Sequence, residues 1–415
     1  MPRRLLRAAS LLALLAAGCS PAALRYRYRP RLTAPGADIL AALTIAGGNE
    51  AVDGNAVTPL ENGDEAFPAM LEAIHQAAST VHLETYIFND GEIGRNFVEA
   101  LTERARAGVD VRLLLDAVGS RWFGEKNRRA LEEAGVQVVF FRPLRRNLLK
   151  FYLRTHRKLL IVDGRVGFTG GLCIDDAWTG NAGDPGHWRE TQVRVAGPVV
   201  RQMQAGFARA WLDATDEVLS AHALYPELPA AGGMRAQVMD STPGFRTNPA
   251  RLSFLVAVAS AKSTIEITNA YMVLDDVARE ALERSAERGV RVRLLLPSRH
   301  TDARAVRYAG RSDYKSLLGS GVEIHEYEPA RLHAKTMIVD GAWASIGSAN
   351  LDNRSFIWNY EANLNVFDAE LAGKLEEMFE RDLRLSRQVT LAEWKKRPWS
   401  DRLLEAFYSI LRSQY

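Results

Sequence analysis

The stretch of sequence that decides the fold reads THRKLLIVDGRVGFTGG over residues 155–171, and it recurs as LHAKTMIVDGAWASIGS over residues 332–348. Four residues of the first copy recur in the second after the same interval of 177 positions. They are His156, Lys158, Asp163 and Gly170, which match His333, Lys335, Asp340 and Gly347. A repeat at a fixed interval indicates that one structural unit occurs twice in the chain.

The segments upstream of the motif repeat in the same order in both parts of the chain. The matching pairs are TVHLETYIF (80–88) with TIEITNAYM (264–272), GVDVRLLLD (108–116) with GVRVRLLLP (289–297), and GVQVVFFRP (135–143) with GVEIHEYEP (321–329). Near-continuous apolar runs are typical of buried parallel strands, and helical patterns at 93–107 and 277–288 each end at a glycine. The pattern predicts an α/β fold of two similar halves, each a mixed or parallel sheet flanked by helices.

The repeat divides the chain into five segments. We expect a signal peptide of lipoprotein type at 1–18, a tether at 19–55, an N-terminal half at 56–228, a C-terminal half at 229–392 and an amphipathic tail at 393–415. The tail has apolar residues at helical spacing, which fits either a helix packed on its own domain or a helix lying in a membrane interface. Pairing of the halves about a pseudo-two-fold axis would bring both motif copies into one site.

Composition limits the class of protein. The chain has 415 residues, 47% of them apolar and 25% charged, which excludes a disordered chain and a polytopic membrane protein. Its two cysteines, Cys19 and Cys173, exclude a disulfide-rich scaffold and a cysteine-based zinc site. The formal charge of +3 comes from three arginines in residues 1–18, and the remaining chain has 50 basic and 50 acidic residues. Attraction to an anionic partner must therefore be local.

The N-terminus reads MPRRLLRAASLLALLAAGC, a basic segment followed by an apolar one and by small residues. This is the layout of a secretory signal, too short to span a membrane as a helix. Its end, LAAGC (15–19), resembles the bacterial lipobox, in which the cysteine is diacylated and becomes the mature N-terminus. The resemblance predicts lipidation of Cys19 and a membrane-anchored lipoprotein of the bacterial cell envelope. A plain signal peptide and a buried helix start are the alternatives.

The motif H-x-K-x4-D suits chemistry on a phosphodiester. Residues i and i+2 of a strand face the same side, so the histidine and lysine of each copy point together. One neutral imidazole can attack phosphorus covalently, and a second, protonated imidazole can protonate the leaving oxygen. Two lysines can hold the non-bridging oxygens. This scheme requires no metal and no cofactor.

With these motifs the chain resembles the phospholipase D superfamily, and it is most similar to bacterial cardiolipin synthases. The resemblance covers roughly residues 60–412 and is carried by NGDEAFPAMLEAI (62–74), HLETYIFNDGEIG (82–94), RAGVDVRLLLDAVGS (106–120), the motif copies, the Trp188–Pro198 stretch and IGSANLDNRSF (346–356). It implies two α/β halves with one shared active site and a phosphohistidine intermediate. It further implies that His156 is the nucleophile and that His333 is the general acid and later the base.

The resemblance also assigns roles to residues outside the motif. Ser348 and Asn350 match the phosphate donors G-S-x-N of the family. Glu361 lies 28 residues after His333, where family members place a carboxylate that orients the histidine, and Glu190 is its counterpart in the first half. Asp163 and Asp340 are expected to hold local structure rather than to transfer protons. Two positions of the first half depart from the second: Cys173 stands where the family usually has asparagine, and Gly171 stands opposite Ser348.

The implied activity is that of a phosphatidyltransferase that joins two phosphatidylglycerols into cardiolipin and glycerol. A phospholipase D-type hydrolase is the alternative if water is the acceptor; a nuclease and a non-catalytic lipid-binding protein are less favoured. The expected partners are a phospholipid substrate and a membrane surface, with no nucleic acid. The basic run Arg142–Lys158 suits either an anionic lipid surface or a solvated face.

Overall fold

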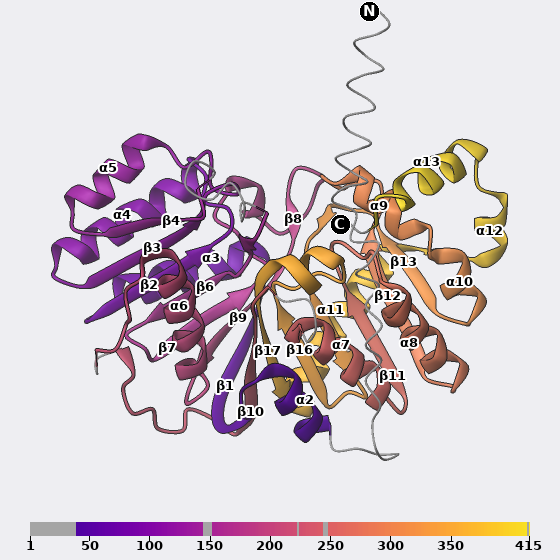
Figure 1. Cartoon of the computed structure of the whole chain (residues 1–415), viewed down its shortest axis with the longest axis horizontal. Helices are drawn as coiled ribbons and strands as arrows, with labels where there is room; N and C mark the ends of the chain where they lie inside the picture. The colour runs from indigo at the N-terminus through magenta and orange to yellow at the C-terminus, as the bar shows by residue number, and fades with distance from the viewer. Residues whose placement is uncertain (1–38, 144–151, 222–223, 244–247, 413–414) are drawn as a thin grey trace, which may run out of the picture.

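A computed structural model of the chain describes residues 39–143, 152–221, 224–243, 248–412 and 415. A mixed sheet of sixteen strands runs through both halves (Figure 1), and its order reads almost the same from either end. The first half contributes β4 (Gln137–Phe141), β3 (Asp110–Asp116), β2 (Thr80–Thr85), β6 (Leu159–Val162), β7 (Val166–Gly170), β9 (Thr191–Ala196) and β1 (Val52–Glu61). The second half continues with β10 (Met234–Ser241), β17 (Asn359–Phe367), β16 (Trp343–Gly347), β15 (Thr336–Val339), β11 (Thr264–Thr268), β12 (Arg291–Pro297) and β13 (Glu323–Tyr327), and β18 (Ser386–Val389) is added at its edge. The sixteenth strand, β5 (Arg154–Thr155), pairs with β17 outside this order.

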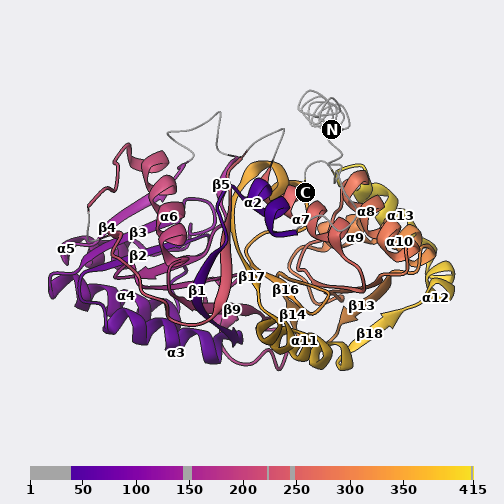
Figure 2. The same ribbon diagram turned by 90° about the horizontal axis from the view of Figure 1, so that it is seen from below.

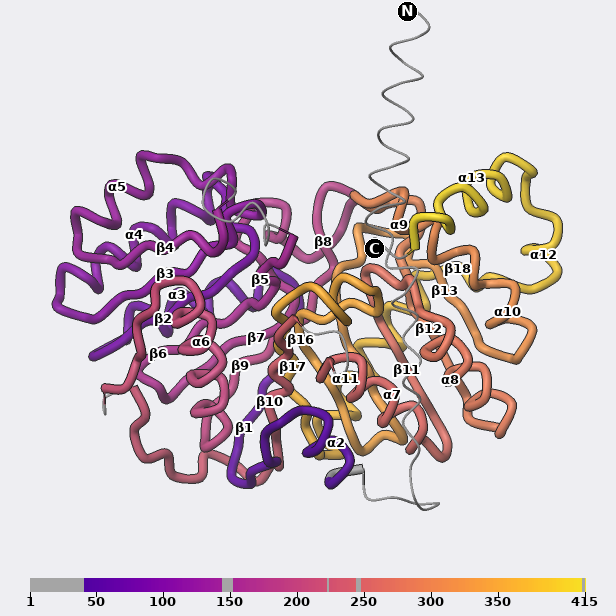
Figure 3. The backbone as a smooth tube through the Cα atoms, in the orientation of Figure 1, coloured from indigo at the N-terminus to yellow at the C-terminus, as the bar shows by residue number. Residues whose placement is uncertain are grey.

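The two halves join through the antiparallel ladder of β1 and β10. Figure 3 shows the chain path as two lobes side by side, with these two strands at the boundary. The apolar runs DVRLLLD and RVRLLLP form the parallel strands β3 and β12, and their side chains are nearly all buried. The predicted fold of two similar α/β halves is therefore confirmed.

Helices cover both faces of each half (Figure 2). In the first half, α3 (Asn62–His75) and α4 (Glu92–Arg106) lie on one face and α6 (Val200–Thr215) on the other, with α5 (Glu125–Glu133) at the outer end. In the second half, α7 (Pro249–Ser260) and α8 (Asp276–Glu287) lie opposite α11 (Ala369–Arg384). The helices α4 and α8 stop at Gly108 and Gly289, whose φ angles of +90° and +93° suit glycine and end the helical hydrogen bonding.

The described residues form three large apolar cores and a small fourth one around Tyr327 and Phe379. One lies within each half, and the third is shared: it combines side chains of β6, β9 and α6 with side chains of β15, β16, β17 and α11. Phe207 and Trp211 on α6 and Leu364 on β17 are among its members, and all are almost completely buried. Because the third core takes residues from both halves, neither half buries its full apolar surface alone.

The prediction of a tether at 19–55 is wrong from residue 39 onward, where the chain is already folded. Residues Ile39–Gly47 form the helix α2, which packs on α7 and β10 of the second half, and β1 begins at Val52 rather than at 56. Leu43 is fully buried in the core of the second half, and its carbonyl accepts a hydrogen bond of 3.1 Å from Gln237 Nε2. The apolar sequence of α2 explains why it packs instead of extending into solvent. The predicted signal peptide, Cys19 and the rest of the tether lie outside the described residues.

The C-terminal tail folds as α12 (Leu391–Lys396) and α13 (Trp399–Ser409). α13 packs on α9 (Arg304–Arg311), and α10 (Tyr314–Gly319) packs on α12. Among the helices that the structure describes, none is long and apolar enough to cross a membrane.

The basic side chains of the run Arg142–Lys158 that the structure describes do not form a solvated face: Arg142 is half-buried, and Arg154, Arg157 and Lys158 are buried. Arg154 is buried against Asp116, with Nη1 at 3.2 Å from Oδ1. Arg157 is fully buried, donates to the carbonyl oxygens of Gly206 and Ser241 at 3.2 Å, and forms an ion pair with Asp240. Residues 144–151 of the run lie outside the described residues. The run therefore includes one cation, Arg157, that fastens the first half to β10.

We predict that Arg157→Met destabilises the fold by about 3–5 kcal/mol, because it removes the buried one of the two arginines that pair with Asp240 and leaves two buried carbonyls without their donor. The matched control is Arg165→Met in the same hairpin, where the side chain is exposed and the expected change is within about 0.5 kcal/mol. Urea unfolding followed by circular dichroism measures both. Equal unfolding midpoints for the two variants would contradict the structural role of Arg157.

Candidate active site

The first motif copy is hydrogen-bonded to a strand of the opposite half. The short strand β5 (Arg154–Thr155) pairs in parallel with the start of β17, where Arg154 lies opposite Asn359 and Thr155 opposite Tyr360. The ladder continues into the motif, because the backbone N–H of His156 donates to the carbonyl of Tyr360 at 2.9 Å. Glu361 is the next residue of β17. His156 is therefore placed beside a carboxylate from the second half.

The second copy repeats this arrangement with the halves exchanged. The strand β14 (Arg331–Leu332) pairs in parallel with β8 (Trp188–Arg189), and the backbone N–H of His333 donates to the carbonyl of Arg189 at 2.8 Å. Glu190 follows directly after β8. His333 is therefore placed beside a carboxylate from the first half.

The carboxylates consequently orient the histidines in crossed pairs. His156 Nδ1 lies 3.0 and 3.1 Å from the two oxygens of Glu361, and His333 Nδ1 lies 2.5 Å from Glu190 Oε2. The expectation that Glu361 orients His333 and that Glu190 does the same for the motif of its own half is wrong. Spacing along the chain matched each glutamate to the nearer motif, whereas the parallel pairings β5·β17 and β14·β8 connect each motif to the other half.

The surroundings of Glu361 stabilise its ionised form. Ser348 Oγ donates to it at 2.5 Å, Ser355 Oγ at 2.7 Å and Asn359 Nδ2 at 3.2 Å. Burial alone raises the pKa of the carboxyl, but His156, Lys158 and the hydroxyl donors outweigh burial and lower that pKa to about 2. The Ser348 hydroxyl is fully buried and directed at Glu361. Its position suits the orientation of Glu361 rather than direct contact with a phosphate.

Glu190 has fewer hydrogen-bond donors than Glu361. The backbone N–H of Thr191 donates to its Oε1 at 2.9 Å. Burial again raises the pKa of the carboxyl, and Lys335 and His333 outweigh burial and lower that pKa to about 2. Both glutamates are therefore ionised at neutral pH, so each can accept a hydrogen bond from the Nδ1–H of its histidine.

Both histidines are neutral in the free site. Burial is the main cause that lowers the pKa of each to about 4; Lys158 opposes protonation of His156, and Lys335 opposes protonation of His333. A neutral imidazole whose Nδ1–H donates a hydrogen bond to a carboxylate has an unprotonated Nε2. That nitrogen is the atom that can attack an electrophile or accept a proton.

The two lysines reach the same site from opposite halves. Lys158 Nζ donates to the carbonyl of His156 at 2.6 Å, and Lys335 Nζ donates to the carbonyl of His333. Burial lowers the pKa of Lys335 to about 8, and the positive charge of Lys158 acts in the same direction. Two buried ammonium groups whose charges act on each other favour an anion between them.

Aromatic side chains that sequence reasoning missed line both motif copies. Tyr86 packs edge-on to His156 with 5.1 Å between ring centroids, and Tyr271 packs in the same way on His333 at 6.0 Å. Lys158 and Lys335 lie over the rings of these tyrosines. Both tyrosines lie in the repeated segments 80–88 and 264–272, so the repeat itself was a signal that could have identified them.

The second copy has an additional aromatic wall. Trp178 and Trp188 stack on each other at 5.1 Å, and both contact the ring of His333 at 5.3 and 5.0 Å. Trp178 ends a short 3-10 turn (Asp176–Trp178), and Trp188 lies on β8. The surroundings of His333 are therefore more apolar than those of His156. The family resemblance included the stretch that begins at Trp188, but it gave neither tryptophan a place beside the histidine.

Comparison with known proteins agrees with this geometry. The family model described as "Cardiolipin synthase, PLD-like domain" matches residues 70–211 and 255–383, which is more than half of the chain and includes both motif copies. The chain belongs to the phospholipase D-like cardiolipin synthase family. Its two matched regions correspond to the two halves of the fold.

Relatives and solved structures extend the comparison. The chain is 36% identical over 351 residues to a probable cardiolipin synthase of Bacillus subtilis, covering 84% of this chain and 70% of the relative. It is 37% identical over 380 residues to cardiolipin synthase 2 of Bacillus anthracis, covering 90% and 72%. The crystal structure of phosphatidylserine synthase from Haemophilus influenzae has the same fold, with a TM-score of 0.68 at 13% identity over 91% of this chain and all of that one.

The motif aspartates of this family member lie at the hairpin turns and hold the fold. Asp163 accepts hydrogen bonds from the backbone N–H groups of residues 78–80 at 2.7–2.9 Å, and Asp340 accepts the equivalent bonds from residues 262–264 at 2.7–3.1 Å. Although burial raises the pKa of both carboxyls, these donors outweigh it and lower the pKa. Both residues have positive φ angles near +52°, which an aspartate tolerates in a tight turn.

The two positions of the G-S-x-N pattern differ between the halves. Asn350 is buried, its backbone N–H donates to Ser355 Oγ at 3.0 Å, and its Oδ1 has no hydrogen-bond partner among the described residues. Cys173, at the equivalent place in the first half, is a buried free thiol whose pKa is raised by burial. A thiol that stays protonated is a poor nucleophile.

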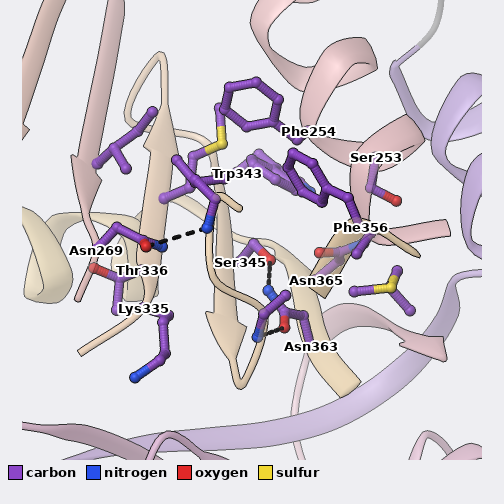
Figure 4. Close-up of a pocket in the computed structure, with 16 residues that line it drawn as sticks. Ser253, Phe254, Asn269, Lys335, Thr336, Trp343, Ser345, Phe356, Asn363 and Asn365 are labelled. Atoms are coloured by element: carbon purple, nitrogen blue, oxygen red, sulfur yellow. Dashed lines mark hydrogen bonds between the residues drawn. The ribbon is translucent and has the colours of Figure 1, made fainter. Parts of the chain in front are cut away.

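A small cavity of about 50 Å³ lies behind Lys335 in the second half (Figure 4). Phe254, Trp343 and Phe356 line one side of it, and Ser345 and Asn363 are joined by a hydrogen bond on the other. Figure 4 shows the amine of Lys335 pointing away from the three aromatic rings. The cavity therefore accommodates the stem of Lys335 and is far too small for a lipid headgroup with its glycerol.

The crossed pairing predicts which histidine responds to each glutamate. In Glu361→Gln, His156 loses the carboxylate that holds its Nδ1 proton, so its tautomer changes, while His333 keeps its own. In Glu190→Gln the response is reversed. Imidazole ¹⁵N chemical shifts at pH 7 report the tautomer of each ring.

Single variants His156→Gln and His333→Gln assign the resonances in this experiment. A change confined to the histidine of the same half as the substituted glutamate would contradict the crossed pairing.

Proposed function

We propose that this chain is a phosphatidyltransferase of the cardiolipin synthase type, which joins two phosphatidylglycerols into cardiolipin and releases glycerol. The observation that carries the proposal is the pair of buried, neutral imidazoles, each held at Nδ1 by a carboxylate of the opposite half. The relatives at 36–37% identity that bear the name cardiolipin synthase support the choice of substrate.

In the first step, His156 Nε2 attacks the phosphorus of one phosphatidylglycerol. A P–N bond forms and the P–O bond to the terminal glycerol breaks, while His333 gives its Nε2 proton to the departing oxygen. The products are free glycerol and a phosphatidyl group on His156. His333 requires a proton at the start of this step, and the negative charge of the bound phosphodiester favours that protonated form against the lowering effect of burial.

In the second step, a hydroxyl of the second phosphatidylglycerol attacks the same phosphorus. His333, now neutral, accepts the hydroxyl proton; the new P–O bond forms and the P–N bond breaks. Cardiolipin leaves, His156 is neutral again, and His333 has recovered its proton. In the second step each histidine therefore reverses its role: His156 is the leaving group instead of the nucleophile, and His333 is the base instead of the acid.

The assignment of His156 as the nucleophile rests on the asymmetry of the two carboxylates. Glu361 contacts His156 through both oxygens and receives donors from Ser348, Ser355 and Asn359, which hold the imidazole in one orientation. A nucleophile profits from a fixed ring. His333 has apolar neighbours in Trp178 and Trp188, a setting that suits proton exchange with an oxygen shielded from bulk water.

The lysines and the tyrosines suit the transfer of a singly charged phosphodiester. Lys158 and Lys335 approach from the two halves and can hold one non-bridging oxygen each, where charge grows in the transition state. Asn350 has a buried side-chain oxygen without a described partner, so a reorientation of this amide toward substrate would break no bond of that oxygen. In the first half the thiol of Cys173 contributes only a weak donor, so the proposed phosphate contacts fall mainly to the second half.

We propose in addition that the protein is anchored by lipid on Cys19, after removal of residues 1–18. The sequence LAAGC and the preceding basic and apolar segments support this reading. One acyl signal gives only reversible membrane binding, and a diacylated cysteine gives stable attachment.

The assay that tests the proposal is incubation of the purified protein with labelled phosphatidylglycerol and separation of the products. Cardiolipin and glycerol in equal amounts are expected, and His156→Ala and His333→Ala should each lower turnover by at least about 10³-fold. His75→Ala, a substitution of an exposed histidine, is the matched control and should keep full activity.

Phosphatidic acid as the main product would make the protein a hydrolase instead. No turnover of any phospholipid would contradict both readings, and full activity in either active-site variant would exclude the shared site. Because the scheme uses side chains alone, addition of EDTA should leave the rate unchanged.

The anchor has its own test. Cells that express the chain and are fed radioactive fatty acid should incorporate label into the protein, and Cys19→Ala should abolish that incorporation. Label that persists in Cys19→Ala would refute lipidation at this position, whereas Cys173→Ala, at a buried thiol, should leave it unchanged.

A further inference from the structure

The helix α13 exposes a continuous apolar stripe. Trp399, Leu403, Phe407 and Ile410 recur at helical spacing and are 74%, 59%, 60% and 77% exposed. With Leu404, they form nearly half of the large hydrophobic side chains that are exposed within the described chain. We call Trp399, Leu403, Phe407 and Ile410 the α13 apolar face. A patch of this kind on one helix marks an interaction surface rather than scattered surface residues.

The opposite side of α13 is the one that packs on the protein, and it is polar. Glu405 is only 3% exposed and forms ion pairs with Arg397 at 2.7 Å and Arg311 at 3.4 Å. Tyr408 stacks on Tyr308 of α9. A helix that packs on its own domain normally turns its apolar side inward. Here the buried charge network fixes α13 with its apolar face outward.

The position of α13 connects this face to the active site. α13 packs on α9, and the segment that leads into α9 carries Asp302, which accepts a hydrogen bond of 2.7 Å from the Tyr271 hydroxyl. Tyr271 in turn packs on His333. In Figures 1 and 3, α13, α9 and β8 lie at the same edge of the molecule. The helix α13 therefore lies at the edge of the molecule where β8 brings Glu190 to His333.

We propose that the α13 apolar face docks on the surface of an anionic phospholipid bilayer. The charges beside it favour that occupant: Lys395, Lys396 and Arg402 are exposed, against the exposed Glu393 and the half-buried Asp401. Basic residues next to exposed tryptophan and large aliphatic side chains are typical of interfacial helices. The inference deepens the proposed function, because docking at this edge presents the site to lipid in the plane of the membrane.

Docking along α13 has a consequence for the substrate. A lipid that enters from the bilayer can leave its acyl chains in the membrane and move only its headgroup toward the two histidines. The α13 apolar face would then contact the bilayer that holds the acyl chains, while the two histidines act on the headgroup of the same lipid.

The test is flotation of the full chain with vesicles, carried out in a Cys19→Ala background so that lipid on that residue does not contribute. The variant combines Leu403→Gln, Phe407→Gln and Ile410→Gln. Glutamine keeps helix propensity high, and circular dichroism and the thermal midpoint check that the fold is intact. We expect its affinity for phosphatidylglycerol vesicles to fall at least about tenfold.

The matched control carries three exposed apolar residues elsewhere, Ile45→Gln, Val218→Gln and Leu385→Gln, and should bind as the parent does. Binding of the parent should also weaken on vesicles of phosphatidylcholine and at high salt.

Equal binding by the α13 variant and the control would overturn the inference. So would a lipid-independent dimer, detected by light scattering, that only the α13 variant loses, because the face would then be an interface between copies. The measurement is of binding and not of turnover. Its failure therefore leaves the proposed reaction untouched, and a protein that docks without turnover would count only against the reaction.

Discussion

The structure depends on two short parallel ladders that cross between the halves. Residues 154–155 pair with the start of β17 and residues 331–332 with β8, and each ladder is extended by the backbone N–H of a motif histidine. Strand pairing fixes position to a fraction of a residue, since a slip by one residue would turn the side chains to the other face. The pairings thereby set His156 beside Glu361 and His333 beside Glu190. The rest of the fold holds these ladders in register.

Electrostatics in the site follow from that geometry. Six buried titratable groups meet in the site: two imidazoles and two ammonium groups lie against two carboxylates, which also accept hydrogen bonds from hydroxyl and backbone donors. Burial keeps the imidazoles neutral and the crossed carboxylates fix their tautomer, so both Nε2 atoms are unprotonated before substrate arrives. A phosphodiester that binds between Lys158 and Lys335 places its negative charge next to both ammonium groups. Substrate binding and protonation of one histidine are therefore thermodynamically linked.

The sequence allowed the repeat, the α/β class and the six motif residues to be predicted, because identical residues at a constant interval are visible without a structure. It did not allow the partner of each glutamate to be predicted. Linear spacing relates Glu361 to His333, but the contact of Glu361 is with a residue 205 positions away, across a strand pairing that local periodicity does not encode. The same limit applies to the basic run: charge alone suggested a surface, whereas Arg157 is enclosed by carbonyls and by Asp240 from other elements. The end of the predicted tether is wrong because the apolar helix α2 packs on α7 and β10, and the sequence around α2 does not show that these elements are its partners.

The almost mirror-like strand order has a meaning for how this protein can change over time. After a duplication, one copy is usually free to diverge while the other retains the ancestral role. Here each half supplies a histidine to the site and the carboxylate for the other half's histidine, so neither copy is redundant. The halves have nevertheless diverged at other positions of the site, as at Cys173, where the second half has Asn350. Because of the reciprocal strand pairing, neither half can form the site without the other.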